Sequence, residues 1–260
     1  MMQPVLHKYQ IANGVVAFST TRHGGVSKGN YTSFNINHYC GDNLEHIAEN
    51  RKRLCALLNI DDTYLVYPHQ THGVEVRRID NRFMTLPSIE RQDALEGVDA
   101  IVTDLCGVCI GVSTADCIPV LLYDEPHHAV AAIHAGWRGT VGRIVKKTVA
   151  AMCETYGTDP LQLRAVIGPG ISLKNFEVGD EVYAAFSDAG FPMDRIAKKY
   201  EKWHIDLSEC NRIQLITAGV QKENIHMSNI CTYDHVDTFF SARRLGINSG
   251  RILTAIMLHS

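Results

Sequence analysis

The chain has 260 residues, of which 45% are hydrophobic and 20% are charged, and its formal net charge at pH 7 is −3. A chain of this size and composition can bury a substantial core, and we predict one domain over residues 1–260. It has no basic tail, no block of like charge and no apolar run of membrane-spanning length, so neither nucleic acid nor a membrane is expected as a partner.

Apolar periodicity predicts strands and helices along the whole chain. In chain order, the predicted elements are a strand over Val15–Ser19, a helix over Leu44–Leu58, strands over Val74–Ile79, Ala100–Thr103, Val108–Ser113, Ile118–Tyr123 and Val130–His134, a helix with an apolar stripe from Val141 to Met152, a strand over Ala165–Ile167, helices over 178–188 and 206–218, and a strand over Ile252–Met257. The acidic stretch Glu90–Asp99 is interpreted as a solvated loop. Asp206 or Ser208 is expected to cap the start of the 206–218 helix. The predicted fold class is α+β, one compact domain whose helices cover largely antiparallel or mixed sheets.

The two strands around Asp124–His127 are predicted to form a hairpin that brings a thiol and an imidazole together. If the turn centres on Glu125–Pro126, antiparallel pairing places Cys117 opposite His134. The Cβ atoms of opposed residues lie about 4.5–5.5 Å apart, close enough to bind one metal ion or to act as a nucleophile and its base. A slip of one residue in register would place the two side chains on opposite faces.

The segment from His134 to Thr140 takes the hairpin into a helix through two glycines, with Thr140 expected as the N-cap. Free backbone N–H groups at such a helix start favour an anion, and Arg138 could add a bidentate contact to phosphate. Taken alone this pattern is weak, since Arg138 could simply form a surface salt bridge, but its position beside His134 gives it weight.

A catalytic zinc ion commonly takes three protein ligands, so the Cys–His pair needs a third. The string His69-Gln-Thr-His72-Gly73 precedes a predicted strand. His72, beside a glycine at the strand start, is the preferred third ligand, and His69 is its rival.

The eight cysteines lie at positions 40, 55, 106, 109, 117, 153, 210 and 231. They are scattered through a chain that is too long to need disulfides, so they do not indicate a disulfide framework. Reduced thiols in the cytoplasm are therefore expected. Cys106-Gly-Val-Cys109 is a CxxC string, but no second pair follows at zinc-ribbon spacing. We interpret it as structural.

Ten strings carry a resemblance to a known family. They are Thr20-Thr-Arg-His-Gly-Gly-Val26, Ser33-Phe-Asn-Ile-Asn37, Gly41-Asp42, Gln70-Thr-His-Gly73, Asp99-Ala-Ile-Val-Thr103, Thr114-Ala-Asp-Cys117, His134-Ala-Gly-Trp-Arg-Gly139, Ile167-Gly-Pro169, Phe176-Glu-Val-Gly-Asp180 and Phe239-Phe-Ser-Ala-Arg-Arg244. In these strings, from about residue 15 to 257, the chain resembles the laccase-domain proteins, also called polyphenol-oxidase-like or purine nucleoside phosphorylase-type.

This resemblance implies a compact α/β sandwich and a metal site whose ligands fall on His72, Cys117 and His134. It implies an enzyme, with zinc as the cofactor and copper as the alternative metal. The implied partners are purine nucleosides and phosphate. The implied reactions are phosphorolysis of adenosine, inosine, guanosine and methylthioadenosine to free base and ribose 1-phosphate, and deamination of adenosine.

Zinc with one open position suits both reactions, because it polarises water or an oxyanion. In phosphorolysis the precise placement of phosphate relative to the ribose C1′ carries the rate. Asp116, beside the thiol, is a candidate proton carrier or ribose acceptor, and the cap of a local turn is an equal alternative. Three residues in matching strings are candidate substrate contacts, with loop-fixing hydrogen bonds or salt bridges as the alternative: Arg22, Asn35 and Arg243.

Three other functions compete with this one. A copper-dependent polyphenol oxidase with several copper centres would need paired His-x-His strings, which the sequence lacks, although one copper ion at the same trio remains open. A metal-free cysteine hydrolase would use Cys117 as nucleophile and His134 as base, leaving His72 without a role. A zinc-stabilised binding module would be expected to have four ligands. The His-x-Glu and Pro-Cys-x-x-Cys strings of cytidine-type deaminases are absent.

Two segments depart from the family pattern. Gly170–Phe176 replaces a cysteine-rich stretch of many relatives and is expected to shape base or ribose recognition. Asp80–Val98 looks longer than usual and could form a lid or an oligomer contact. Cell-wall precursor editing has been linked to some members, and nothing in these residues discriminates it.

Overall fold

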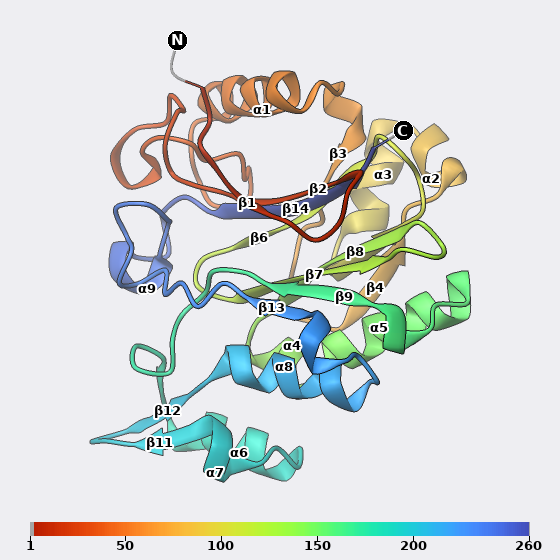
Figure 1. Ribbon diagram of the computed structural model, residues 1–260. Helices are drawn as coiled ribbons and strands as arrows, with labels where there is room; N and C mark the ends of the chain where they lie inside the picture. The colour runs from red at the N-terminus through yellow and green to blue at the C-terminus, as the bar shows by residue number, and fades with distance from the viewer. Residues whose placement is uncertain (1–2, 260) are drawn as a thin grey trace.

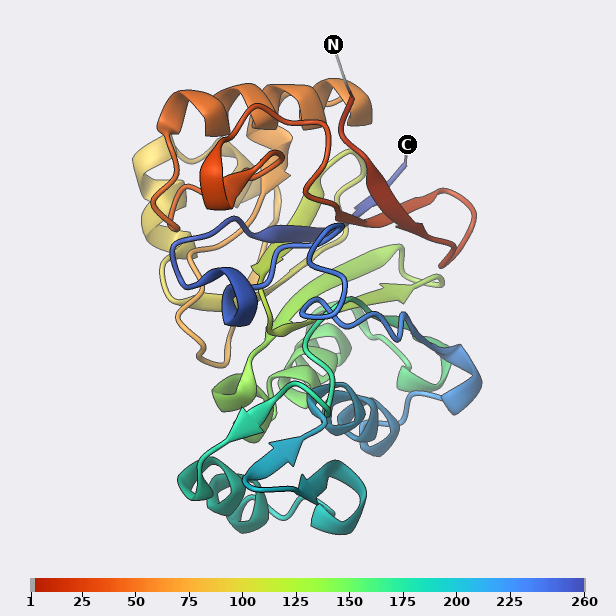
Figure 2. The ribbon, with the colours of Figure 1, turned by 90° about the vertical axis from the view of Figure 1, so that its left-hand side faces the viewer.

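Two β-sheets lie face to face at the centre of the molecule, and helices cover both outer faces (Figure 1). The computed structural model describes residues 3–259. The long helix α1 (Leu44–Leu58) lies over one sheet, and α5 (Ile144–Tyr156) and α8 (Leu207–Thr217) lie under the other (Figures 1 and 2). This helix–sheet–sheet–helix sandwich confirms the predicted α+β class.

The first sheet has five strands in the order β1-β2-β14-β6-β3. Their bounds are Leu6–Tyr9 for β1, Val15–Thr20 for β2, Ile252–Leu258 for β14, Cys109–Thr114 for β6 and Leu65–Val66 for β3. The last strand of the chain, β14, pairs antiparallel with both β2 and β6, whereas β3 pairs parallel with β6.

The second sheet has six strands in the order β13-β9-β7-β8-β5-β4. Their bounds are Ile225–Met227 for β13, Arg164–Ile167 for β9, Ile118–Asp124 for β7, Ala129–Ala135 for β8, Val98–Thr103 for β5 and Glu75–Arg78 for β4. The two edge strands pair parallel with their neighbours and the inner pairs are antiparallel, so both large sheets are mixed.

The remaining elements are short and lie mainly at the periphery. A three-stranded sheet in the order β10-β12-β11 uses Glu177–Val178, Trp203–Ile205 and Ala197–Lys199. The other α-helices are α2 (Asn81–Thr85), α3 (Ser88–Leu95), α4 (Trp137–Val141), α6 (Asp180–Asp188), α7 (Met193–Ile196) and α9 (Ala242–Leu245). Single 3₁₀ turns occupy Gly29–Tyr31, Asp62–Tyr64, Pro160–Gln162 and Lys222–Asn224.

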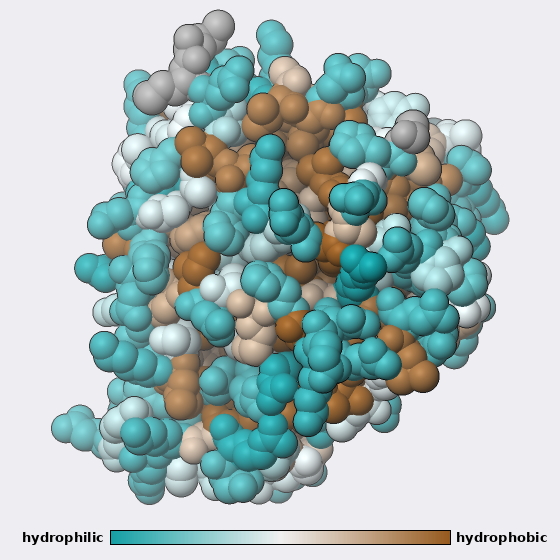
Figure 3. Space-filling view, in the orientation of Figure 1, coloured by the Kyte–Doolittle hydropathy of each residue, from teal (hydrophilic) through white to brown (hydrophobic). Residues whose placement is uncertain are grey.

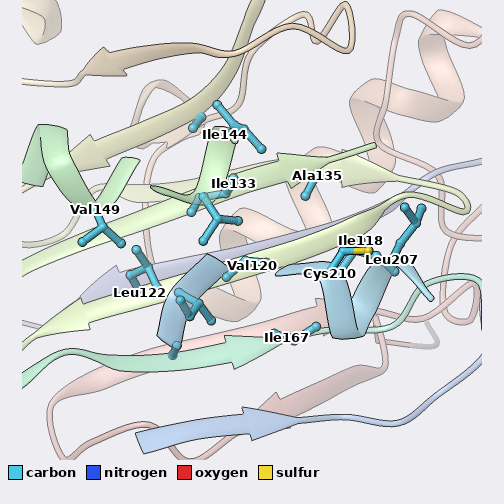
Figure 4. Close-up of a cluster of buried hydrophobic side chains, with 14 of the residues drawn as sticks. Ile118, Val120, Leu122, Ile133, Ala135, Ile144, Val149, Ile167, Leu207 and Cys210 are labelled. Carbon is cyan, nitrogen blue, oxygen red and sulfur yellow. The ribbon is translucent and has the colours of Figure 1, made fainter. Parts of the chain in front are cut away.

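The central hairpin of β7 and β8 is buried on both faces because it lies between the helices and the other sheet. Alternate side chains such as Val120 and Ile133 pack toward α5 and α8 (Figure 4), whereas Leu121 and Ala132 pack toward the first sheet. Since successive side chains of a strand point to opposite faces, such a strand needs apolar residues at nearly every position. This burial explains the unbroken apolar runs that predicted the hairpin.

Local signals set the ends of the principal helices. The Asn43 side chain accepts hydrogen bonds from two backbone N–H groups at the start of α1, and Asp206 accepts one from Glu209 at the start of α8. The predicted helix after the central hairpin is interrupted at Arg143, which has a φ of 65°, and therefore forms two helices, α4 and α5.

The prediction that Glu90–Asp99 is a solvated loop was wrong. Its first part belongs to α3 and its last two residues begin the buried strand β5. Phe83 of α2 and Leu95 of α3 pack into the core between the two sheets, so the segment covers one edge of that core. Among residues 3–259, no helix combines the length and the apolar character needed to cross a membrane. Apolar and polar side chains are interspersed on the face seen in Figure 3.

Candidate metal centre

The hairpin places Cys117 and His134 on one face, although its register differs from the prediction. Pro119 rather than Cys117 faces His134, because the turn occupies residues 125–128 and is shifted along the chain. The predicted pairing was therefore wrong by two residues. Side chains alternate with a period of two, so a shift of two keeps both residues on the same face and makes them diagonal neighbours.

The structure brings three side chains together at this position. His72, Cys117 and His134 each offer one ligand atom, an imidazole nitrogen or the cysteine Sγ. These three atoms lie within 4.8 Å of one another. No other group of this kind occurs in the part of the chain that the structure describes. Two imidazoles and one thiolate form a donor set that suits Zn²⁺ with one open position, so these residues fit a catalytic metal.

His72 is held in place by the loop between β3 and β4. The Gln70 amide makes two hydrogen bonds with the backbone of Ser113, donating to its carbonyl at 2.7 Å and accepting from its N–H at 2.9 Å. His72 itself has a φ of 65°. The rival ligand His69 is not part of the trio, since its Nδ1 lies 2.8 Å from a Glu96 oxygen and its ring stacks on Tyr39.

The buried carboxylate of Asp99 organises the centre from behind. It accepts a 2.7 Å hydrogen bond from Nδ1 of His134, and also accepts bonds from the backbone N–H groups of Thr71, His72 and Gly73. Because Nδ1 of His134 is engaged, its Nε2 is left for the cluster. Sequence reasoning discounted this residue, although one carboxylate at the start of an apolar strand was a signal for it.

The charges of the centre stabilise one another. Burial would raise the pKa of Asp99, but the hydrogen bonds from His134 and the backbone outweigh it and hold that pKa below its usual range. Burial would also raise the pKa of Cys117, and the adjacent imidazoles of His134 and His72 lower it instead. Burial would lower the pKa of His134, whereas Cys117 and Asp99 raise it. The lowered pKa of Cys117 favours its thiolate, the form that binds metals.

Gly136 leaves the space in which the three ligands meet. It is the N-cap of α4, with φ −67° and ψ 170°. A Cβ at this position would lie 2.9 Å from Cδ2 of His72 and 3.1 Å from Sγ of Cys117. Thr140, expected as the N-cap, lies inside α4 and donates its backbone N–H to the Gly136 carbonyl, so that prediction was wrong.

A polar cavity of about 230 Å³ opens at the trio, and all three candidate ligands line it. We call it the metal-side cavity. Ser113, Thr114, Asn37 and Gln70 add hydroxyl and amide groups to its wall. Sequence reasoning did not find these four as wall residues, because they belong to the end of one strand and to two loops.

A second cavity of about 350 Å³ lies on the other side of Cys117. We call it the aromatic cavity, because Trp137 and Phe176 form part of its wall. Its wall also includes Ile171. The 170–176 loop, which was expected to shape base recognition, therefore contributes to this cavity through Ile171 near its start and Phe176 at its end. Cys117 and Ile247 line both cavities.

Asp116 and Arg243 line the aromatic cavity and contact each other. The Asp116 carboxylate accepts one hydrogen bond from the backbone N–H of Arg243 at 2.8 Å and another from the Thr232 hydroxyl at 2.5 Å. The Arg243 guanidinium lies over the Phe176 ring, 5.6 Å from its centroid. The structure thus brings these two predicted residues to the edge of the centre.

The other predicted substrate contacts lie outside the two cavity walls. Arg22 donates to the carbonyls of Thr32 and Val236, and buried Asn35 bonds to Asp42 and to the backbone N–H of Arg251. Both therefore hold loops together. Arg138 is exposed, and its guanidinium lies 4.3 Å from the centroid of the neighbouring Trp137 ring.

Replacing Asp99 with asparagine is expected to weaken zinc binding about 10–100-fold, because His134 loses the carboxylate that fixes its orientation and its basicity. Titration of the purified protein against a competing chelator measures this affinity. Asp104→Asn is the matched control, since Asp104 is partly exposed, lies outside the trio and forms an ion pair with Arg78. Equal zinc affinity for Asp99→Asn and the unmodified protein would contradict the assigned role.

The fold is a four-layer sandwich, and two histidines and one cysteine converge beside two cavities. These features indicate a protein built around a candidate metal centre. The sequence profile described as multi-copper polyphenol oxidoreductase laccase matches residues 16–259, and the chain belongs to this family. The resemblance predicted from the sequence is thereby confirmed.

Relatives and solved structures agree with this membership. The chain is 50% identical over 245 residues to a purine nucleoside phosphorylase of Bacteroides thetaiotaomicron, covering 93% of this chain and 91% of the relative. It is 47% identical to adenosine deaminase RL5 of an unknown prokaryotic organism, covering 94% of each. The crystal structure of YlmD from Geobacillus stearothermophilus superimposes with a TM-score of 0.89 at 31% identity, covering 97% of this chain and 94% of that one.

Proposed function

We propose that this protein is a zinc-dependent enzyme that splits purine nucleosides with phosphate and also deaminates adenosine. The proposed substrates of phosphorolysis are adenosine, inosine, guanosine and methylthioadenosine, and the products are the free base and ribose 1-phosphate. The observation that carries the proposal is the convergence of His72, Cys117 and His134 at the cavities. Relatives named for both activities support it.

The chain's own groups prepare the centre for this chemistry. Asp99 fixes the orientation of His134, and the two imidazoles hold Cys117 as a thiolate. A bound zinc ion supplies a Lewis acid at this position. Because the trio lines the metal-side cavity, a substrate atom in that cavity would lie beside the residues that would hold the zinc ion.

Asp116 remains a proposed site residue, in a positioning role. Both of its carboxylate oxygens already accept hydrogen bonds, from Thr232 and from the backbone of Arg243, so it fixes α9 against the aromatic cavity. Arg243 is the proposed substrate contact whose side chain lines a cavity. For Arg22 and Asn35 we propose indirect effects on substrate binding, through the loops that they join.

Arg138 is proposed to contact phosphate. Arg138→Ala should then raise the KM for phosphate more than the KM for nucleoside, by about tenfold for one charge-assisted contact. Initial rates at varied phosphate and at varied inosine separate the two constants. The reverse ranking would remove this role and leave Arg138 as a neighbour of Trp137 only.

The decisive experiment uses purified protein of measured metal content, with adenosine and inosine as substrates, with and without phosphate. Phosphate-dependent release of free base that is lost on chelation and restored by zinc supports the phosphorylase. Inosine formed from adenosine without phosphate supports the deaminase.

Other outcomes of the same experiment favour the competing functions. Full activity after chelation indicates a cysteine hydrolase that uses Cys117 and His134. Oxidation of a phenol only when copper is bound, without nucleoside turnover, indicates a polyphenol oxidase.

All eight cysteines are free thiols in the structure, which supports the proposed cytoplasmic location.

A further inference from the structure

The two cavities at the centre are complementary in size. Pockets for small molecules usually enclose about 300–1,000 Å³. The metal-side cavity falls below this range and the aromatic cavity lies near its lower end, whereas their combined volume lies well within it. Since Cys117 and Ile247 line both, one ligand that extends across these two residues would fill both cavities.

The aromatic cavity is suited to a flat, apolar group. Trp137 and Phe176 are partly exposed, and buried Ile171 and Leu207 complete an apolar wall. Nucleobases stack on such side chains irrespective of their identity, because each base has a π-face. The Arg243 guanidinium at the same wall donates to the carbonyls of Asn175 and Glu177, and because it carries five N–H groups it can also donate to acceptors on a base edge.

Two residues in the wall of the metal-side cavity carry buried hydroxyl groups that lack a partner. Ser113 Oγ and Thr114 Oγ1 are buried and make no hydrogen bond to any residue between 3 and 259. The two residues are only 7% and 2% exposed, and both line this cavity. An unpaired buried hydroxyl is costly, and it can both donate to and accept from a hydroxyl of a ligand.

Ile247 lies where the two cavities meet. It is 73% exposed, although its side chain is large and apolar. The loop that carries it follows α9, which lies on the left of Figure 1 and faces the viewer in Figure 2. A ligand that occupies both cavities would cover this side chain.

From these observations we propose that a nucleoside spans both cavities. Its purine base occupies the aromatic cavity against Phe176 and Trp137, its sugar hydroxyls bond to Ser113 and Thr114, and it crosses Ile247. The glycosidic bond, which joins the two halves of the ligand, then lies at the junction beside Cys117. This inference rests on the proposed nucleoside function and adds which cavity binds which half.

The base half is tested with Phe176→Ala. Calorimetric titration of the zinc-loaded protein, without phosphate, should show about tenfold weaker binding of both hypoxanthine and inosine, the loss expected for one base–aromatic contact. Tyr200→Ala is the control, because Tyr200 is an exposed aromatic residue outside both walls. Hypoxanthine affinity within twofold of the unmodified protein would overturn the placement of the base.

The sugar half is tested with Thr114→Val, which keeps the shape of the side chain and removes its hydroxyl. Inosine should bind about tenfold more weakly, hypoxanthine should bind equally well, and the penalty should shrink for 2′-deoxyinosine or for 3′-deoxyinosine. The melting temperature should stay equal or rise, because the variant removes an unpaired buried hydroxyl. Ser113→Ala, which keeps the backbone bonds to Gln70, should show the same pattern.

The outcomes separate this inference from the proposed function. If the unmodified protein splits inosine but Thr114→Val weakens hypoxanthine as much as inosine, the division between the cavities is overturned and the enzyme function stands. If the unmodified zinc-loaded protein neither binds nor splits any nucleoside, the proposed function fails and this inference fails with it.

Discussion

Replacing Cys117 with alanine is expected to abolish stoichiometric zinc binding and to lower nucleoside turnover about 10³-fold or more. The thiolate is one of only three candidate ligands, and the several kcal/mol that a metal contributes to a transition state correspond to a factor of this size. Zinc per chain, measured by elemental analysis, and the initial rate with inosine and phosphate test the expectation together.

Other cysteines of the chain provide the controls for this substitution. Cys106→Ala should leave both zinc content and turnover unchanged, because Cys106 is exposed and lies outside the trio. Cys109→Ala should also keep the zinc, although it removes a fully buried side chain and will lower stability. His134→Ala should reproduce the loss seen with Cys117→Ala. A His72→Ala/Cys117→Ala double variant that still bound one zinc ion per chain would refute the ligand assignment.

Gly136→Ala is expected to lower turnover at least about 100-fold and to weaken zinc binding. The new methyl group would lie 2.9 Å from the His72 ring and 3.1 Å from the thiolate, so the ligands must separate. A displacement of about 1 Å at a reacting centre can cost a factor of this size. Chelator competition and steady-state rates measure the two effects, and circular dichroism checks that the fold is kept.

A nearly identical backbone position elsewhere supplies the control for Gly136→Ala. Gly179 is the N-cap of α6, with φ −76° and ψ 167°. The three atoms nearest to a Cβ at this residue belong to the carboxylate of Glu181, an exposed side chain that can rotate away. Gly179→Ala should therefore keep zinc affinity and rate. Similar losses in both variants would show that helix capping, rather than the space at the trio, explains the effect.

The elements that the sequence predicted well are those whose burial leaves a periodic pattern. The eight predicted strands are all present, and α1 matches its predicted bounds. Asp124 explains why the hairpin register was wrong. It pairs with Ala129 as the last residue of β7, because its buried carboxylate bonds to Thr158 and lies 2.9 Å from Nδ1 of His127. A polar residue beside Glu125–Pro126 resembles a turn residue until its distant partner Thr158 is known.

The convergence of the three candidate ligands was predictable from their strings, whereas the residues around them were not. The partners of Asp99, His72 and His134, lie 27 and 35 residues away along the chain. Because other acidic residues precede β5, the sequence predicted that Asp99 is exposed to solvent rather than buried. Ser113 and Thr114 resemble ordinary strand residues, and only the folded structure shows that their hydroxyls lack partners. Loop residues such as Ile247 have no periodicity, so their convergence on a cavity leaves no trace in the sequence.

The order of the strands has a consequence for how the molecule comes apart. The loop that carries His72 runs from β3 in the first sheet to β4 in the second, and Cys117 lies where the chain passes from β6 in the first sheet to β7 in the second. A metal ion held by these residues would therefore link two separate connections between the sheets. Because unfolding that separates the sheets would have to release the ion, we expect resistance to unfolding to increase with metal occupancy.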